Sequence, residues 1–331
     1  MDDMYDITVG PDMMSYDMLV VTGPTASGKT ALAATIAHRL GGEVISADSR
    51  QIYRKMNLGT GKDYNDYIVD GKPVPYHLID IADPGYKYNV FEYQRDFTAT
   101  LLGMRSRGAF PVVCGGSGMY IDAIVSGYRM FEVPPDPEFR ASLEDKSLSE
   151  LAGILSSYKK LHNITDLDTR KRAIRAIEIE RFNEMHRGKQ SASPEVRPLV
   201  TGILYSREER RERISARLRQ RLSEGMIDEV KQMLDEGISP ESLIYYGLEY
   251  KYLTLYLTGR LTYDNMFRAL ETAIHQFAKR QMTWFRGMER RGVKIHWING
   301  ELPFEQKVDY VLKLLFQISV EPFKEFPLPD D

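Results

Sequence analysis

The chain has 331 residues, of which 43% are hydrophobic and 27% are charged, and its formal net charge is −3 at pH 7. This composition is typical of a globular protein with one large or two ordinary domains, and it excludes a strongly basic, non-specific nucleic-acid coat. No apolar run reaches the roughly 18 residues of a membrane span, the acidic start is not a secretory signal, and the single cysteine, Cys114, cannot form an internal disulfide. We therefore expect a cytoplasmic protein with no membrane partner.

A phosphate-binding loop is predicted near the N-terminus. Residues 18–21 form a short apolar strand, and residues 23–30, GPTASGKT, lead into a segment with helical spacing of apolar residues. The loop fits the pattern G-x-x-x-x-G-K-[ST] and lies between a strand and a helix, as that motif requires. Its glycines let successive N–H groups point at an anion, and the following helix adds its positive end. Lys29 would supply a charge to phosphate oxygens, and Thr30 would place its hydroxyl on magnesium.

A second strand, residues 43–47, follows this helix and leads to Asp48. Strand, loop, helix and strand form a βαβ unit, which implies a parallel sheet with ligands beyond the carboxyl ends of its strands. We expect this strand to lie next to the phosphate-loop strand, so that Asp48 faces the phosphates and acts as a general base for an incoming nucleophile. An ordinary turn or cap role for Asp48 and Ser49 is the alternative.

Further strands are predicted at 77–81 and 110–114, and the second leads into a glycine-rich turn at 115–118 that would form another wall of the pocket. The strand that ends at Cys114 lacks the aspartate that holds magnesium in a typical phosphate-loop NTPase. Asp80 could substitute for it, or could simply accept turn N–H groups. NTP hydrolysis is therefore a weaker hypothesis than group transfer from a phosphate-bearing donor.

From residue 132 onward the pattern is mainly helical. Helices are expected at 140–146, 149–159, 168–183, 207–223, 225–236, 241–258, 262–288 and 304–317, with strands at 197–205 and 293–298. The predicted fold is α/β, with a P-loop NTPase-like parallel sheet flanked by helices and an inserted all-helical RNA-binding domain. The expected limits are a core at 17–131 and 197–317, an insertion at 132–196, and flexible tails at 1–16 and 318–331.

Two basic segments have the character of RNA contacts. Arg172 and Arg175 share one face of the predicted helix at 168–183, whose other face is apolar, and such cations would bind RNA phosphates without reading sequence. Residues 275–286 interleave aromatic rings, amides and cations, a mixture that suits stacking on unpaired bases. Packing of those aromatic rings in the core is the alternative for this segment.

Together these motifs resemble those of the tRNA dimethylallyltransferases. The likeness covers about residues 18–298 and includes, in the family's order, GPTASGKT, SADSRQIYRKMNLGTGK, HLIDIADP, PVVCGGSGMYIDAIVSG, RKRAIRAIEI and AKRQMTWFRG. It implies transfer of a dimethylallyl group from dimethylallyl diphosphate to the exocyclic amine of the adenine just 3′ of the anticodon in tRNA. The phosphate loop would then hold the prenyl diphosphate with magnesium, and no NTP would be hydrolysed.

The resemblance also implies residue roles. Asp48 and Thr25 would be catalytic, with Asp48 as the general base, and Thr30 would contact magnesium. The diphosphate would be bound by Gly23, Thr25, Ala26, Ser27, Gly28, Lys29, Thr30 and Arg217. The tRNA anticodon stem-loop would contact Asp48, Ser49, Arg50, Gln51, Lys171, Arg172, Arg175, Gly247, Lys251, His275, Gln276, Lys279 and Arg280. The protein would act as a monomer.

The chain departs from the family pattern at three places. Ser117 stands where the family has the threonine of Gly-Gly-Thr-Gly, residues 247–251 replace Gly-Tyr-Lys-Glu, and residues 274–276 replace Thr-Arg-Gln. Alternative functions are an adenylate isopentenyltransferase acting on free AMP, ADP or ATP, a small-molecule kinase, and a non-catalytic RNA-binding protein. The helical insertion favours tRNA, because a free nucleotide needs no such surface.

Overall fold

The computed structural model describes residues 15–127, 130–159, 165–186 and 194–318. The chain divides into two compact units, one made of residues 1–127 with 194–331 and the other of residues 128–193. The second unit thus begins at 128 where the sequence suggested 132, and ends at 193 where it suggested 196. Most of the two predicted tails, at 1–14 and 319–331, lies outside the described residues. Within the described part of the chain, no helix has the length and apolar character to cross a membrane.

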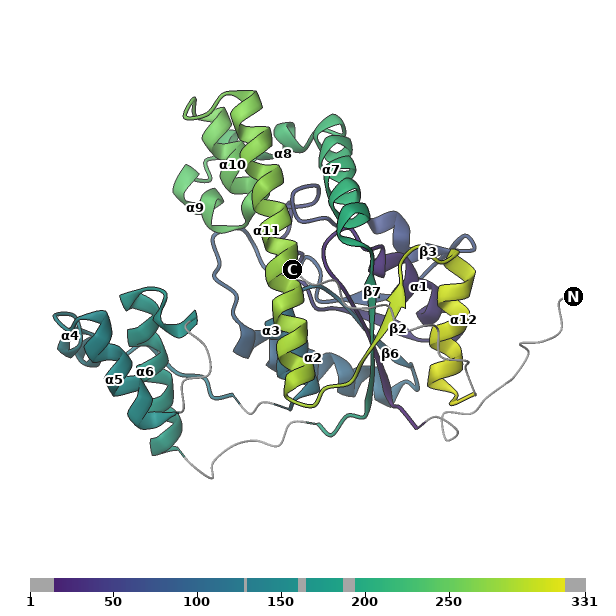
Figure 1. Cartoon of the computed structure of the whole chain (residues 1–331), viewed down its shortest axis with the longest axis horizontal. Coiled ribbons are helices and arrows are strands. Elements are labelled where there is room, and N and C mark those ends of the chain that lie inside the picture. Colours follow the sequence, from purple (N-terminus) through teal and green to yellow (C-terminus); the bar gives the residue numbers. More distant parts are fainter. Residues whose placement is uncertain (1–14, 128–129, 160–164, 187–193, 319–331) are drawn as a thin grey trace, which may run out of the picture. The chain divides into compact units, whose positions relative to one another are not determined.

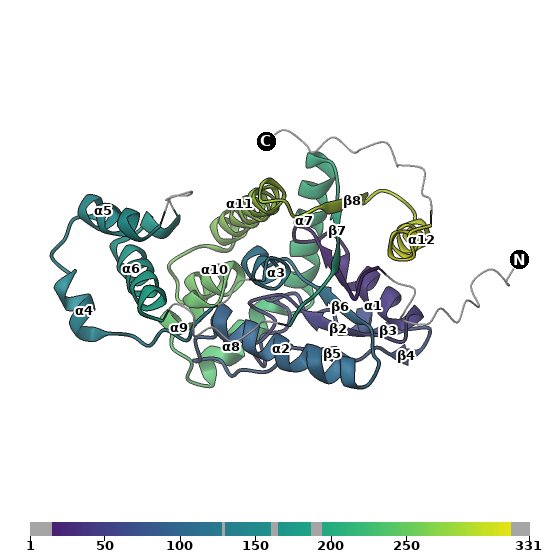
Figure 2. The same ribbon diagram turned by 90° about the horizontal axis from the view of Figure 1, so that it is seen from below.

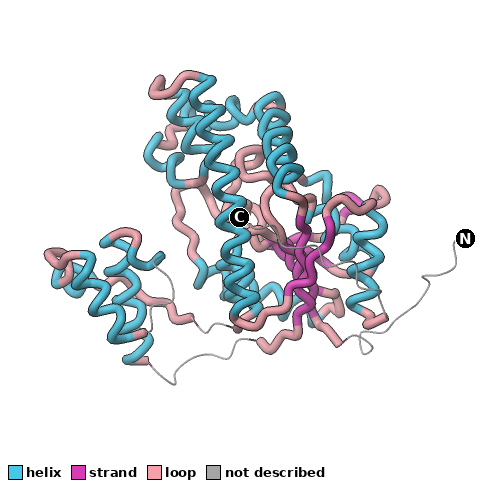
Figure 3. Tube along the Cα trace, in the orientation of Figure 1, coloured by secondary structure: helices cyan, strands magenta, loops and turns pink. Residues whose placement is uncertain are grey.

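The first unit is built on a six-stranded parallel sheet, coloured magenta in Figure 3. The strand order is β5-β2-β6-β1-β7-β8. Their bounds are β1 Met18–Thr22, β2 Glu43–Ser46, β5 Tyr76–His77, β6 Pro111–Cys114, β7 Pro198–Leu204 and β8 Ile295–Asn299. A separate antiparallel ribbon pairs β3 (Ile68–Val69) with β4 (Lys72–Pro73), and the short 3₁₀ helix Tyr64–Tyr67 precedes it.

Helices cover both faces of the sheet, which explains why its central strands are apolar throughout. Along β1 the side chains alternate: Leu19 and Val21 pack on one face, and Met18 and Val20 on the other. The first face is covered by α1 (Lys29–Arg39) and α12 (Phe304–Leu315), as Figures 1 and 2 show. The second is covered by α2 (Val90–Ser106), α3 (Gly118–Val125) and the carboxyl-terminal half of α11 (Tyr263–Arg290).

A further layer of helices lies beyond the carboxyl ends of the strands (Figure 1). It comprises α7 (Arg207–Ser223), α8 (Met226–Asp235), α9 (Pro240–Tyr245), α10 (Leu248–Leu257) and the start of α11. These helices pack around Ile52, Tyr53 and Met56, which follow β2, and their cluster also includes Ala26 of the phosphate loop. The helical layer is therefore packed directly against the loops where a ligand of a parallel sheet binds.

The second unit is a small helical domain with a core of its own. It contains α4 (Pro137–Ser142), α5 (Leu148–Tyr158), a 3₁₀ turn (Thr165–Leu167) and α6 (Arg170–Met185). Ser147 and Glu150 form a capping box at the start of α5, and the Thr169 hydroxyl accepts a hydrogen bond from the main chain at the start of α6. Leu151, Leu155 and Ile177 fill the space between the helices.

The structure confirms the predicted α/β class and parallel sheet, but three details of the sequence interpretation are wrong. The strand before Asp48, β2, is not next to β1, because β6 lies between them. The predicted strand at 77–81 ends at His77, since Leu78 and Asp80 adopt left-handed backbone angles. The helix predicted at 241–258 is broken at Gly247, whose φ is 144°.

Replacing Leu151, which is fully buried in the second unit, with alanine should lower the free energy of unfolding of that unit by about 3 kcal/mol, because a buried leucine leaves a cavity. Amide hydrogen exchange in α5 and α6 measures the loss. Leu148→Ala is the matched control, since Leu148 lies on the same helix and is 38% exposed. It should change stability by less than about 0.5 kcal/mol. Equal effects of the two variants would contradict this packing of the helical unit.

Candidate active site

The phosphate loop, residues 23–28, joins β1 to α1 in a conformation that few residues tolerate. The φ angles of Gly23, Ala26 and Gly28 are 146°, 63° and 79°. A Cβ on Gly23 would lie 2.8 Å from the main-chain oxygen of Ile203, so only glycine fits there. No side chain caps the start of α1, and its first turn holds no acidic residue. The N–H groups at this helix end are therefore left for an anion.

Two polar groups, one in the loop and one at the start of α1, have little compensation from hydrogen bonds. Ser27 is 2% exposed, and its hydroxyl has no hydrogen-bond partner in the described part of the chain. The ammonium of Lys29 donates a long hydrogen bond of 3.5 Å to the carbonyl of Pro24. Burial lowers the pKa of Lys29, whereas nearby Asp48 acts to raise it. A bound anion would satisfy both groups, and this fits a diphosphate site.

Helix α7 carries three arginines spaced four residues apart, one of which contacts this loop and two of which contact the segment at 58–63. Arg213 donates to the carbonyl of Ala26 at 3.2 Å. Arg217 and Arg221 share the carboxylate of Asp63, at 2.7 and 2.5 Å respectively. Burial lowers the pKa of the Arg217 guanidinium, and the charge of Arg221 lowers it further. The carboxyl groups of Asp63, Asp66 and Glu249 act on Arg217 in the opposite direction.

One carboxylate oxygen of Asp48 stabilises the turn after β2, and the other is left without a hydrogen bond among the described residues. Its Oδ1 accepts a hydrogen bond of 2.9 Å from the N–H of Arg50. Its Oδ2 has no hydrogen-bond partner among residues 15–127, 130–159, 165–186 and 194–318. Because Asp48 acts electrostatically on Lys29, its carboxylate lies near the start of α1. The loss of adjacency between β2 and β1 therefore does not remove Asp48 from the site.

The glycine-rich turn after β6 ties the Asp48 segment to the sheet. The hydroxyl of Ser117 accepts a hydrogen bond of 2.9 Å from the N–H of Ser49, and lies 3.1 Å from the Ser49 hydroxyl. The main-chain N–H of Ser117 donates to the carbonyl of Ala47 at 3.2 Å. Gln51 reaches the other way, donating to the carbonyl of Gly61 at 3.0 Å. Serine in place of threonine at position 117 thus keeps the hydroxyl contact.

The carboxylates of Asp80 and Glu229 hold loops near the site in place, and the sequence did not predict these contacts. Asp80 accepts hydrogen bonds from the ammonium of Lys62 at 2.5 Å and from the Tyr64 hydroxyl at 2.6 Å. Each of its oxygens therefore binds a neighbouring side chain of the same chain. Glu229 on α8 accepts from the Tyr250 hydroxyl at 2.6 Å and from three consecutive main-chain N–H groups at 57–59. It holds the segment on which Asp63 lies.

Comparison with known proteins decides the family. The family model described as IPP transferase matches residues 51–288, and that described as isopentenyl transferase matches residues 16–72. Proteins named tRNA dimethylallyltransferase from Phocaeicola vulgatus and Parabacteroides distasonis are 59% and 58% identical to this chain. Each alignment covers 92% of this chain and 99% of the relative. The chain belongs to the tRNA dimethylallyltransferase family.

Solved structures agree with this assignment. The tRNA isopentenylpyrophosphate transferase of Bacillus halodurans is 30% identical, with a TM-score of 0.65 over 90% of this chain and 95% of that one. A eukaryotic dimethylallyltransferase acting on tRNA has a TM-score of 0.68 over 93% of this chain and 81% of its own, and at 20% identity it supports the fold alone.

The family residues predicted to contact tRNA in the first unit are mostly accessible. Gln276, Lys279 and Arg280 are exposed on α11. His275 differs from them, because burial, reinforced by the charge of Arg211, lowers its pKa. Its ring is therefore neutral near pH 7 and cannot replace the charge of an arginine. Lys251 lies 5.2 Å above the ring of Tyr252.

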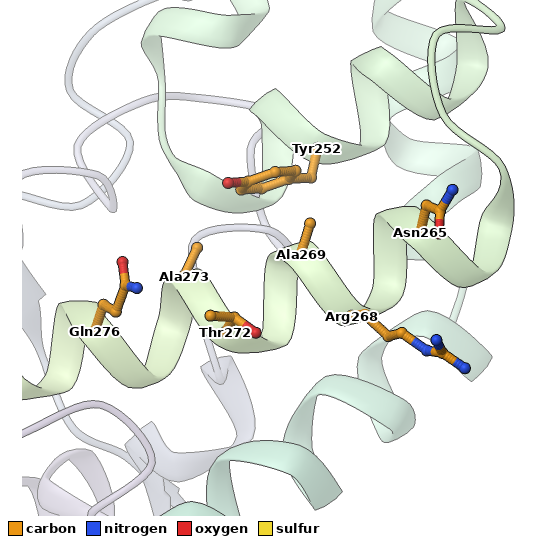
Figure 4. Close-up of a pocket in the computed structure, with 7 residues that line it drawn as sticks. All are labelled: Tyr252, Asn265, Arg268, Ala269, Thr272, Ala273 and Gln276. Carbon is orange, nitrogen blue, oxygen red and sulfur yellow. The ribbon is translucent and has the colours of Figure 1, made fainter.

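A shallow pocket of about 440 Å³ lies between α10 and α11 (Figure 4). The ring of Tyr252 lies across the helix face that carries Ala269 and Ala273, and Gln276 closes one end. None of its lining residues belongs to the phosphate loop or to the Asp48 segment. It is therefore separate from the phosphate loop and from Asp48, although Gln276 belongs to the predicted tRNA contacts.

The basic helix of the second unit is only partly free. Lys171 is exposed, and Arg172 pairs with Asp168 at 2.6 Å on the surface. Arg175 instead contacts Glu178 and donates to the carbonyl of Val133 at 2.8 Å. Burial opposes ionisation of Glu178, but hydrogen bonds that include those from Arg140 and Arg175 lower its pKa to about 2. Arg175 thus stabilises the helical unit.

The thiol of Cys114, the one cysteine in the sequence, should be unreactive in the native protein. It is 5% exposed under the phosphate loop, and burial raises its pKa to about 12, against the lowering effects of Lys29 and the Thr30 hydroxyl. At pH 8 the group is therefore a thiol, and a disulfide reagent that needs the thiolate should label it at least about a hundredfold more slowly than in denaturant. Fast stoichiometric labelling of the folded protein would disprove this environment.

Proposed function

We propose that this chain transfers a dimethylallyl group from dimethylallyl diphosphate to the exocyclic amine of the adenine just 3′ of the anticodon in tRNA. One observation carries the proposal: Asp48, which keeps one oxygen unpaired among the residues that the structure describes, lies near enough to Lys29 of the uncapped phosphate loop to act on its ammonium electrostatically. The names of the relatives support tRNA as the acceptor. A loop that binds phosphate beside a carboxylate is suited to attack on a carbon whose leaving group is diphosphate.

The proposed chemistry needs one base and one anion site. The adenine amine is a weak nucleophile because its lone pair is delocalised into the ring, so it must lose a proton as the nitrogen–carbon bond forms. Asp48 Oδ2 takes that proton, while the N–H of Arg50 holds the other oxygen in place. The carbon–oxygen bond breaks, and its electron pair leaves with the diphosphate. The loop N–H groups, Lys29 and Arg217 stabilise the growing negative charge.

The donor set also fits magnesium as a partner of the diphosphate. The described residues contain no cluster of three or more His, Cys, Asp or Glu side chains that could hold a metal alone. Magnesium commonly takes few protein ligands and completes its shell with phosphate oxygens and water. Thr30 would hold the ion, and its charge would neutralise part of the diphosphate charge. Thr25, whose side chain lies in the same loop, would line the bridging oxygen.

The proposed tRNA path begins at the Asp48 segment, because the target adenine must leave its stack to reach the base. Phosphate and base contacts would come from the exposed residues of α11 and from the start of α10, with Lys171 and Arg172 of the second unit as further cations. The residues assigned to this path are Asp48, Ser49, Arg50, Gln51, Lys171, Arg172, Gly247, Lys251, Gln276, Lys279 and Arg280. All the reacting groups come from one chain, so the proposed active form is a monomer.

Replacing Asp48 with asparagine should reduce kcat by a factor of about 10² to 10⁴, because asparagine keeps the shape but cannot accept the proton. The assay follows label from dimethylallyl diphosphate into unmodified tRNA in the presence of magnesium. Binding of inorganic diphosphate should stay within about twofold, since the loop is unchanged. Asp83→Asn is the matched control, because Asp83 is exposed and pairs with Arg54 on the surface.

Other acceptors in the same assay test the alternatives. Label entering free AMP and not tRNA would replace the proposal with an adenylate isopentenyltransferase. Consumption of ATP without label transfer would replace it with a kinase. Unchanged transfer to tRNA by the Asp48→Asn variant would leave the reaction standing but remove Asp48 as its base.

A double variant, Lys171→Gln with Arg172→Gln, should weaken tRNA binding and flatten its salt dependence. The slope of log K against log[salt] is negative, and its magnitude should fall by about 0.7 to 0.9 for each cation that no longer neutralises a phosphate. The KM for dimethylallyl diphosphate should not change. Lys231→Gln on α8, also exposed, serves as the charge control. An unchanged salt slope would exclude the second unit from the tRNA path.

A further inference from the structure

Gln281 on α11 bridges the two loops that follow the neighbouring strands β1 and β6, namely the phosphate loop and the turn at 115–118. Its Oε1 accepts a hydrogen bond of 2.9 Å from the main-chain N–H of Thr25 in the phosphate loop. Its Nε2 donates one of 2.8 Å to the carbonyl of Gly116 in the turn after β6. The side chain is 7% exposed, so water competes little for these bonds. The orientation of the amide is fixed, because one partner is a donor and the other an acceptor.

The surroundings hold this amide firmly. Its helix neighbours Met282 and Phe285 are fully buried against the sheet. A Cβ on Gly116 would lie 2.5 Å from the Gln281 Nε2 atom, so the turn can approach the amide only because residue 116 is glycine. The amide is therefore carried by a rigid helix and packed against both loops.

The two hydrogen bonds connect the donor side of the pocket to the base side. Thr25 belongs to the loop that would hold the diphosphate. Gly116 precedes Ser117, whose hydroxyl accepts from the N–H of Ser49 next to Asp48. The Gln281 amide thus adds a side-chain link between the phosphate loop and the segment of the base, beside the hydrogen bonds that join Gly115 to Val21 and Thr22 at the end of β1.

We propose that Gln281 is a positioning residue of the transfer reaction. It holds the phosphate loop in its diphosphate-binding shape and at a fixed position relative to Asp48. The proposal rests on the function proposed above. Because the Thr25 N–H is bound to Gln281, it is not among the loop N–H groups that receive the diphosphate. The hydroxyl of Thr25 has no hydrogen-bond partner in the described part of the chain and stays available to the donor.

The test is Gln281→Met, which keeps the length of the side chain and removes both hydrogen bonds. Calorimetric titration with inorganic diphosphate and magnesium should show about tenfold weaker binding, as expected for the loss of one or two hydrogen bonds. In the transfer assay the KM for dimethylallyl diphosphate should rise about tenfold and kcat should fall by a similar factor, whereas the KM for tRNA should stay within about twofold. Gln232→Met is the matched control, since Gln232 is an exposed glutamine on α8 that bonds Glu236.

A second variant keeps the test decisive if Gln281→Met folds poorly. Gly116→Ala leaves the glutamine in place but pushes its Nε2 aside. It should likewise raise the KM for dimethylallyl diphosphate and leave the KM for tRNA within about twofold of the wild type. Diphosphate binding by either folded variant equal to that of the wild type would overturn the proposal. A lower melting temperature with unchanged donor constants would also overturn it, because the role would then be structural only. Failure of the wild type to transfer label to tRNA would instead reject the proposed function, and diphosphate binding would still test Gln281.

Discussion

Main-chain N–H groups that receive a phosphate cannot also bond to the protein, and the rest of the site depends on this constraint. The loop must therefore be held through its other atoms. Gly23 is pressed against Ile203 of β7, the carbonyl of Ala26 accepts from Arg213 of α7, and the N–H of Thr25 is bound by Gln281 of α11. A left-handed non-glycine residue such as Ala26 costs on the order of 1–3 kcal/mol, which these contacts offset. Distant parts of the chain thus stabilise a loop of a few residues.

The cations near the phosphate loop are also positioned by the protein before a substrate binds. Lys29 and Arg217 are half-buried before any substrate arrives, and burial is the largest cause of the lowered pKa of each. Asp63 is shared between Arg217 and Arg221, and the carboxyl groups of Asp66 and Glu249 also act on Arg217. The cost of removing these cations from water is therefore met by folding, and a diphosphate entering the pocket meets donors that are already oriented. Such preorganisation favours stabilisation of a leaving group whose negative charge grows during the reaction.

Local patterns predicted the parts of this structure that local physics determines. The phosphate loop was found because its glycines, lysine and threonine must be consecutive, and α7 was placed at 207–223, as observed. The position of β2 was wrong because a βαβ unit sets the direction of its second strand but not whether another strand is inserted. The strand at 77–81 was overextended because Asp80 is drawn into contacts with Lys62 and Tyr64, which no strand periodicity records.

The residues that the sequence could not identify act through distant partners. Gln281 bonds residues 256 and 165 positions away, and Glu229 bonds a segment about 170 positions away. This distinction also explains where departures from the family pattern are tolerated. Ser117 lies in the hydrogen-bonded network and keeps its hydroxyl, whereas His275 lies outside that network and gives up a charge. The network that positions donor and base thus keeps its hydrogen-bonding groups, whereas the two larger departures from the family pattern lie on α10 and α11. Acceptor choice can therefore diverge without any change in the chemistry.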